Sequence, residues 1–510
     1  MHSRFPAPIT LLTTLLAIVL IGEIDLTEGK EQDLVARLEE PLCPVLSCDE
    51  LPSTPNLLPA PERRPLLFFE NKNFQIVGHL QAGLNLVQEY NVFWNFANLS
   101  SAGNDFDSDP EWLEAYLLPG LSFEHRLTSG VIGYGKMSSV LSGTLEKDAF
   151  DNGNTGRGTW EEGYIGVKSL DAGFDVSAGP RQLKLGSGML IANGGVSGFE
   201  RGALKLGPRK AWEFAGVARM EKQGVSSTIF YLDANELASN NTQTTLSGVD
   251  LRLDFPTGNY LGGTFIYIPT SNAPYPQAAL GGIGAPSILT GAREALNTLD
   301  IYSRYAPEAA PNAFTTAEIA YQRNDRIDLE AFGWRVQIGY SFAQHSWKPT
   351  LTYSYQSFSG DDPNTSRLER FDPLYYEGSP SSWSTGSKSS MMFINSNVAA
   401  HQLALRFTPN PRNSFTLRYH HVRANELRSP IQFGQAARVD FADGISTVIA
   451  GVTDPHLSDD IFLEWSRIQN PNTYVTSGVS VAIPGAGIDA VDAVDTPAWP
   501  GWFVNVVVDY

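Results

Sequence analysis

Arginine and carboxylate side chains alternate with apolar residues in several short segments of the chain. Residues 249–255 (VDLRLDF) are one example, and 333–342 and 401–407 are others. Arginine stays protonated at physiological pH, and its planar guanidinium binds carboxylates through paired hydrogen bonds. A row of such side chains would bind an acidic solute, or would pair with carboxylates of the protein itself. The residues that we expect in such a row are Arg252, Arg304, Arg323, Arg335, Arg406 and Arg418, with Asp250, Asp254, Glu213 and Glu464 as neutralising carboxylates.

Enzyme chemistry finds little support in the sequence. His401, His420 and His421 lie in the same segments as some of the arginines. However, the chain has no Gly-x-Ser-x-Gly elbow, no His-Glu-x-x-His motif and no phosphate-binding loop. We therefore expect no catalytic residues, no metal site and no cofactor.

Composition narrows the class of protein further. The 510 residues carry 55 acidic and 36 basic side chains, a formal net charge of −19. This balance argues against a nucleic-acid partner, which normally requires a basic surface. The only two cysteines, Cys43 and Cys48, exclude a disulfide-dense scaffold, but they could form one local disulfide in an oxidising compartment.

The first 67 residues differ in composition from the rest. Residues 9–21 are an apolar run without charge. The run is too short to span a bilayer comfortably but is typical of a signal-peptide core, so we assign residues 1–29 to a signal peptide whose cleavage position is open. Residues 30–67 are rich in proline and acidic residues and are expected to form an extended periplasmic arm.

Residues 68–510 show a period of two, with apolar or aromatic residues at alternate positions. About 18 candidate strands are separated by turn residues, roughly 25 residues for each strand and its connector, as in membrane barrels. Among their expected starts are Thr159, Val225 and Ala313. The longest segments without a strand pattern are 181–209, 360–398 and 424–457. We expect these to be long extracellular loops, some of them folded into the lumen.

The polar face of each strand decides between two all-β architectures. A transmembrane antiparallel β-barrel turns apolar residues toward lipid and polar residues toward a wet lumen, whereas a soluble propeller or sandwich does the reverse. The signal peptide, the low lysine content and the terminal aromatic residue Tyr510 favour the barrel. We therefore predict a β-barrel in the outer membrane of a Gram-negative cell, with the lipid bilayer as its environment.

Four segments together resemble the alginate export family. They are residues 176–199, which contain Arg181-Gln182 after an inserted Pro180; the loop motif Phe371, Asp372, Pro373, Leu374 and Tyr375, followed by Tyr376; residues 397–419; and residues 456–484. The resemblance implies a monomeric outer-membrane barrel that lets a polymer or solute pass. It also implies contact with polysaccharide synthesis or export machinery in the periplasm.

Three hypotheses for function stay open at this point. The first is passive passage of a charged polysaccharide, as in alginate-like export. The second is a porin that takes up small solutes, and the third is a surface or structural barrel with a plugged lumen. The arginines have two interpretations, contact with the solute or an arginine–carboxylate ladder that stiffens the wall.

Overall fold

The computed structural model describes most of the chain after residue 65. The chain divides into two units, Met1–Leu51 and Pro52–Tyr510, and the described residues all belong to the second. They are 66–95, 107–149, 153–169, 171–195, 198–238, 241–377, 383, 385–386, 393–432, 448–449, 451–490 and 495–510. The predicted signal peptide, all but two residues of the predicted arm, and the Cys43–Cys48 pair lie outside these ranges.

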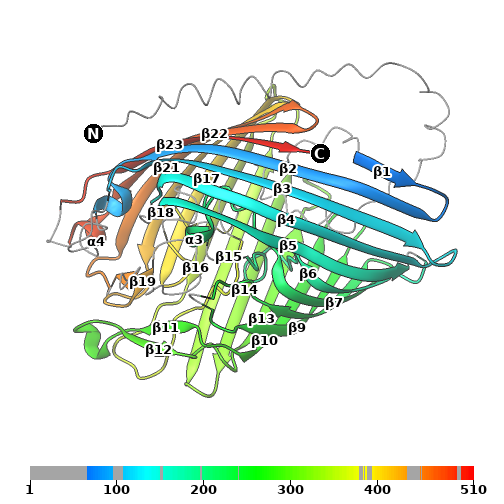
Figure 1. The fold of residues 1–510 in the computed structure, drawn as a ribbon. Coiled ribbons are helices and arrows are strands. Elements are labelled where there is room, and N and C mark those ends of the chain that lie inside the picture. Colours follow the sequence, from blue (N-terminus) through cyan, green and yellow to red (C-terminus); the bar gives the residue numbers. More distant parts are fainter. Residues whose placement is uncertain are drawn as a thin grey trace, which may run out of the picture. The chain divides into compact units, whose positions relative to one another are not determined.

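The strands of the second unit form a closed antiparallel barrel of 18 strands (Figure 1). Each strand pairs with its neighbour in the sequence, and β2 closes the ring by pairing with both β3 and β23. Closure gives every strand of the ring two neighbours, which a barrel in lipid requires because hydrocarbon offers no hydrogen-bond partners. The strands are β2 (Phe74–Glu89), β3 (Glu111–Arg126), β4 (Ile132–Lys147), β5 (Gly153–Ser169), β6 (Phe174–Arg181), β7 (Trp212–Lys222), β8 (Val225–Asp233), β9 (Thr245–Asp254), β10 (Tyr260–Thr270), β13 (Asn297–Tyr305), β14 (Ala313–Asn324), β15 (Leu329–Ser341), β16 (Thr350–Phe358), β17 (Val398–Asn410), β18 (Asn413–Ala424), β21 (His456–Asn470), β22 (Thr473–Pro484) and β23 (Trp499–Asp509).

One further strand lies outside the ring and pairs with the beginning of β2. Strand β1 (Leu66–Glu70) pairs with the first residues of β2, whereas β23 pairs with β2 only from Gln81 onward. Tyr510 exchanges two backbone hydrogen bonds with Leu80, of 2.9 and 3.0 Å, between these two stretches. Strand β1 therefore covers the part of β2 that the last strand does not reach. The sequence pattern did not indicate it.

The outer face of the ring is apolar and exposed. Along β8, Val225, Ile229 and Tyr231 are exposed, whereas Ser226, Thr228 and Phe230 alternate with them and are buried. The same alternation continues around the ring, with Ile165, Leu251, Ile301, Ile338 and Leu403 among the exposed residues. Such a belt is stable only against lipid, which confirms the predicted sidedness. Among the described residues, no helix is long and apolar enough to cross a membrane.

The two ends of the barrel differ in the length of their connections. One end has short turns, such as Gln223-Gly224 between β7 and β8. The other end carries the long loops, and we name four of them L3 (182–211), L5 (271–296), L7 (359–397) and L8 (425–455). Long loops mark the extracellular end of such barrels. L3, L7 and L8 correspond to the three predicted long segments, whereas the sequence pattern did not single out L5.

The loops contain short elements of their own. L3 includes α3 (Gly198–Arg201), and L5 contains the hairpin of β11 (Pro274–Gln277) and β12 (Ser287–Thr290) with η3 (Leu280–Gly282) between them. L8 includes β19 (Ile431–Gln432) and β20 (Val448–Ile449). The two remaining elements are η2 (Val92–Asn95) after β2 and α4 (Ala486–Asp489) after β22.

Candidate functional site

L3 and L7 meet inside the barrel. Ile191 of L3 and Tyr375 of L7 form a parallel β-bridge, in which the Tyr375 N–H donates to the Leu190 carbonyl at 2.9 Å. The Tyr375 carbonyl accepts the Ala192 N–H at 2.9 Å. The Tyr375 ring packs against Trp212 at the start of β7, with centroids 5.1 Å apart. Two loops that are almost 200 positions apart in the sequence thus share a small piece of backbone pairing.

The predicted loop motif anchors L7 to the wall and to L5. Both oxygens of Asp372 accept hydrogen bonds from the Arg293 guanidinium of L5, at 2.7 and 2.9 Å. Both side chains are buried, with 3% of Arg293 and 7% of Asp372 exposed. Gln322 of β14 binds the Asp372 backbone on both sides, accepting its N–H at 2.8 Å and donating to its carbonyl at 2.7 Å. We call this group, Arg293, Gln322 and Asp372, the clasp.

The other residues of the motif complete the anchor. Phe371 is fully buried and packs against Phe358 of β16, with centroids 5.4 Å apart. Leu374 has a φ of +51°, in the left-handed region that asparagine or aspartate visits more readily. This turn is held because the Asp372 carboxylate also accepts the Leu374 N–H at 2.9 Å. Although burial lowers the pKa of Arg293, the Asp372 carboxylate outweighs it and holds that pKa above its usual range.

A second contact joins L5 to L7 closer to the strand end. Asp361 of L7 accepts the backbone N–H of Ala278 at 2.8 Å and of Glu369 at 3.0 Å. Burial raises the pKa of Asp361 despite these hydrogen bonds. The Tyr275 hydroxyl of L5 donates to the carbonyl of Arg370 at 2.5 Å, so the hairpin of L5 follows L7 over several residues.

The loops and the inner wall form one buried hydrophobic cluster. It includes Trp212, Tyr375 and Trp383 from the loop region, and Phe230, Phe358 and Val422 from strands at different places around the ring. A wet pore would leave such wall residues facing water. The described parts of the loops therefore pack against the inner wall at the extracellular end of the lumen, as the sequence analysis expected for some of them.

Most of the predicted pore residues do face the lumen. Alternation along each strand relative to the exposed apolar residues assigns them to the inner face: Arg252, Arg304, Arg335, Arg406, Arg418, Asp250, Asp254 and Glu464. Arg335 and Asp250 are buried, and the Tyr302 hydroxyl and the Thr264 hydroxyl both donate to the Asp250 carboxylate at 2.8 Å.

One predicted residue, Arg323, does not line the lumen. It follows the exposed Ile319 at even spacing on β14, so it points outward; 56% of its side chain is exposed, and its Nε donates to Asp325 at 2.6 Å. The outer face tolerates this charge because Arg323 stands at the extracellular rim, where its end reaches water. Glu213 is an exposed residue at the beginning of β7, next to the buried Trp212 and beside a register shift of the strand pairing.

Luminal charges are paired differently on two parts of the wall. On β3–β5, Lys136 pairs with Glu162 and Lys168 pairs with Glu124, each at 2.6 Å. On β15, Arg335 makes no ion pair with any described residue; its Nη2 lies 3.4 Å from the Ser354 hydroxyl, and its guanidinium lies 5.4 Å from the centre of the Trp383 ring.

Arg418, further along this wall, is also loosely held. Its Nη1 is 3.6 Å from Glu464 Oε2 without a hydrogen bond between them. Arg406 Nε donates to the Ser414 hydroxyl at 3.1 Å. Arg335 and Arg418 are therefore less neutralised than the lysines of β3–β5.

Arg181 is a luminal arginine that sequence reasoning did not include among the pore residues. Arg181 ends β6, is 5% exposed, and lies over the Tyr164 ring at 4.7 Å from its centre. Its position inside the segment 176–199 was visible in the sequence, but its inward direction depends on where β6 ends.

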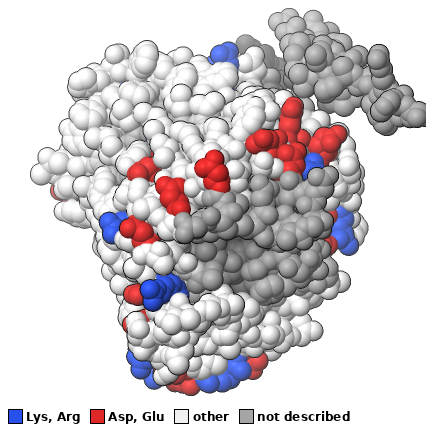
Figure 2. Space-filling view, turned by 90° about the vertical axis from the view of Figure 1, so that its left-hand side faces the viewer, with Lys and Arg blue, Asp and Glu red and all other residues white. Residues whose placement is uncertain are grey.

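Figure 2 shows the extracellular end of the barrel, where acidic side chains gather on the face and basic ones lie mostly toward its edge.

Comparison with known proteins agrees with the fold. OccAB2 of Acinetobacter baumannii superimposes with a TM-score of 0.50 at 7% identity, over 85% of this chain and 98% of that one. OccK2 (OpdF) of Pseudomonas aeruginosa gives 0.49 at 12% identity, over 85% and 97%, and OmpF of Salmonella typhi gives 0.38 at 10%, over 87% and 99%. No curated protein shows significant sequence similarity to the chain.

The closed ring, its apolar outer belt and the polar inner face define an outer-membrane β-barrel of the channel class. Residues 302–458 match the model of the alginate export family. The predicted resemblance to that family is confirmed over this region, which contains the loop motif and the wall from β14 to β18. The fold and the family match together support an outer-membrane channel.

Proposed function

We propose that the barrel passes an anionic polysaccharide, or acidic sugar oligomers of the same chemistry, by passive diffusion along the β15–β18 wall. The observation that supports this proposal most directly is the weak neutralisation of Arg335 and Arg418 on that wall. A carboxylated sugar chain offers Arg418 a closer planar partner than Glu464, which stands 3.6 Å away, and offers Arg335 an ion-pair partner that none of the described residues supplies.

The arrangement suits transit better than tight binding. A path must attract its solute enough for entry but hold it weakly enough for release, so several moderate sites in series serve better than one strong site. Arg335 lies beneath Trp383 of L7, whereas Arg406 and Arg418 lie further toward the periplasmic turns. A chain that enters from the periplasm would reach Arg406 and Arg418 before it meets the loops.

The loops then act as the barrier. The clasp holds L7 in the extracellular half of the lumen, and the L3–L7 bridge closes the space between them. In this proposal a polymer leaves only when L7 moves away from β14 and L5. Direction is set by the solute gradient and by the periplasmic machinery that supplies the polymer, with which a monomeric barrel would work.

Ion selectivity in planar lipid bilayers tests the proposal. The triple variant Arg335→Ala/Arg406→Ala/Arg418→Ala should lose most of the anion preference of the wild type, measured as the reversal potential in a KCl gradient. Alginate oligomers added to the periplasmic side should block the wild-type current and should block the variant at least about tenfold less strongly, a loss of roughly 1.4 kcal/mol in binding. Neutral dextran of similar length should not distinguish the two proteins.

Arg323→Ala is the matched control, since it removes an arginine from the outer face of the neighbouring strand β14. Its selectivity and alginate block should equal those of the wild type. Unchanged selectivity in the triple variant would remove these arginines from the mechanism. Block by small acidic sugars but not by oligomers would favour the uptake porin, and absence of current under all conditions would favour the plugged structural barrel.

A further inference from the structure

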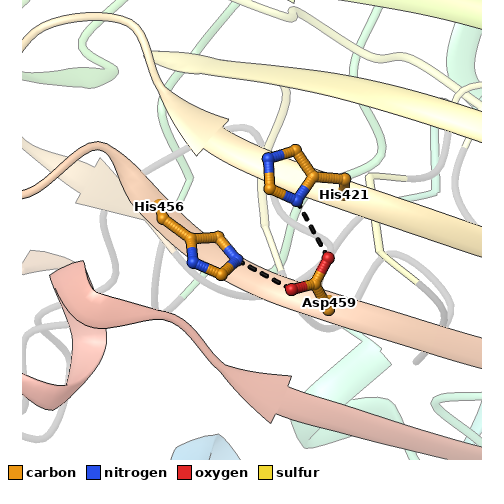
Figure 3. Close-up of side chains that lie close together, drawn as sticks. All are labelled: His421, His456 and Asp459. Atoms are coloured by element: carbon orange, nitrogen blue, oxygen red, sulfur yellow. Dashed lines mark hydrogen bonds and ion pairs between the residues drawn. The ribbon is translucent and has the colours of Figure 1, made fainter.

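Three side chains suited to metal binding converge on the outer face of the barrel. His421 lies near the extracellular end of β18, and His456 and Asp459 lie at the start of β21 (Figure 3). His421 pairs with Asp459 across the two strands. His421 and Asp459 share the outward face because Tyr419 and Ile461, each two positions nearer to the membrane centre, are exposed residues of the apolar belt.

The ligand atoms of the three side chains face one another. His421 Nδ1 lies 2.9 Å from Asp459 Oδ1, and His456 Nε2 lies 2.9 Å from Asp459 Oδ2. The imidazole rings stack with centroids 4.8 Å apart and an angle of 29° between their planes. All three ligand atoms fall within 4.8 Å of one another. Two imidazoles and one carboxylate thus surround a common point.

One of these atoms has no aligned hydrogen bond. His456 Nε2 is buried and has no hydrogen-bond partner, although it stands 2.9 Å from the Asp459 carboxylate. A buried polar atom without a partner costs free energy, and native proteins satisfy the great majority of such atoms. Its direction toward the other two ligands indicates that the partner is a cation shared by all three.

We propose that His421, His456 and Asp459 bind one divalent transition-metal ion, of which Zn²⁺ is the best fit. Zinc binds histidine nitrogen at about 2.0–2.1 Å and carboxylate oxygen at about 2.0–2.2 Å. Tetrahedral ligands at such distances lie roughly 3.4 Å apart, a spacing between the 2.9 Å contacts and the 4.8 Å limit seen here. The sequence-based expectation was that the chain has no metal site.

Neighbouring groups support the site. The Tyr419 hydroxyl donates to Asp459 Oδ1 at 2.6 Å and orients the carboxylate, the kind of outer-shell contact that metal ligands usually have. Three protein ligands leave a fourth position for water or for an oxygen of a lipid headgroup at the rim. L8 begins and ends at the two strands that carry the ligands, so the ion would hold the root of this loop.

Metal titration of the purified protein in detergent tests the proposal. The sample is the untagged chain with Cys43→Ser and Cys48→Ser, treated with chelator, and Zn²⁺ binding is followed by calorimetry. We expect one saturable site per chain. Co²⁺ should give the visible absorption of a four-coordinate ion with nitrogen ligands, and Zn²⁺ should abolish this absorption by displacement.

Variants locate the site. His421→Ala and His456→Ala should each lose the one-site binding and the Co²⁺ spectrum, and Asp459→Asn, which keeps the shape of the side chain, should do the same. His401→Ala is the matched control, because His401 lies on the same outer face but its Nδ1 is engaged with the Tyr353 hydroxyl at 2.7 Å; it should bind as the wild type does. Tyr419→Phe should weaken binding by about 10- to 100-fold.

Either of two results would overturn the proposal. One is a wild-type titration without saturable binding. The other is equal affinity in the wild type and in a folded Asp459→Asn variant. Because the ligands lie on the outer face, neither result bears on conductance through the lumen, so this proposal and the luminal one fail independently.

Discussion

Asp372→Ala should open the channel, because it removes the carboxylate at the centre of the clasp. Arg293 would stay buried, with 3% of its side chain exposed, and would lose the two hydrogen bonds of 2.7 and 2.9 Å. Breaking a buried ion pair by removing one partner costs about 3–5 kcal/mol, because Arg293 then loses a counter-charge that binds it through two hydrogen bonds. The turn at Leu374 loses a hydrogen bond as well.

This cost falls on the conformer in which L7 is docked in the lumen. When L7 moves out, Arg293 gains access to water, so the open conformer does not suffer the same penalty. The lower figure, about 3 kcal/mol, raises the ratio of open to closed conformers by more than 100-fold, because each 1.4 kcal/mol is a factor of about ten. Single-channel recording in planar bilayers measures this ratio directly as the open probability.

Arg367→Ala provides the control. Arg367 belongs to the same loop and its Nη1 lies 2.7 Å from Glu330, but 45% and 35% of the two side chains are exposed. An exposed pair contributes about 0–1 kcal/mol, so the open probability should change by fivefold at most. The reasoning is refuted if Asp372→Ala, shown to be folded by its heat-modifiable electrophoretic mobility, gates like the wild type.

Two further predictions concern pH and the lipid face. Burial raises the pKa of Asp361 in the folded loops. The protonated carboxyl therefore stabilises the folded loops, and this contribution is complete below the unfolded pKa of about 4. The contribution is lost as pH rises through the folded pKa. Asp361→Asn should therefore narrow the difference in hydrogen-exchange protection of L7 between pH 4 and pH 7; an unchanged difference would assign it to other groups. Ile229→Arg, in the middle of the exposed face of β8, should destabilise the barrel by about 2–4 kcal/mol in urea unfolding from lipid, whereas Val225→Arg, at the end of the same face, should cost only about 0–1 kcal/mol. Equal costs at both positions would contradict the membrane placement of this face.

The strand pattern was predictable because a barrel in lipid leaves little freedom in each strand. Every second residue must be apolar, and turns must interrupt the pattern at regular intervals. The 18 strands begin near the expected positions, for example at Val225 and Ala313. The largest shift is at β5, which begins at Gly153 rather than near Thr159. Its first residues include several glycines, which carry no apolar signal.

The direction of single side chains was less predictable near strand ends. Arg323 points outward because the inward positions of β14 are those of Glu318, Ala320 and Gln322, and near the rim a charge is tolerated on either face. A bulge displaces His456 relative to Val422 and Arg423, so the approach of His456 to Asp459 could not be read from alternation alone.

The amino-acid sequence by itself determined the class of protein, the number of strands and the sidedness of the wall, because these follow from local periodicity and from the requirement that lipid meets apolar residues. Only the tertiary structure decided that Asp372 of the Phe371–Tyr375 motif forms the clasp with Arg293 and Gln322, and that the loops pack against the inner wall. These features depend on contacts between loops that are far apart in the chain. Such contacts are set by the closure of the ring, which brings L3, L5 and L7 to one end of one enclosed space.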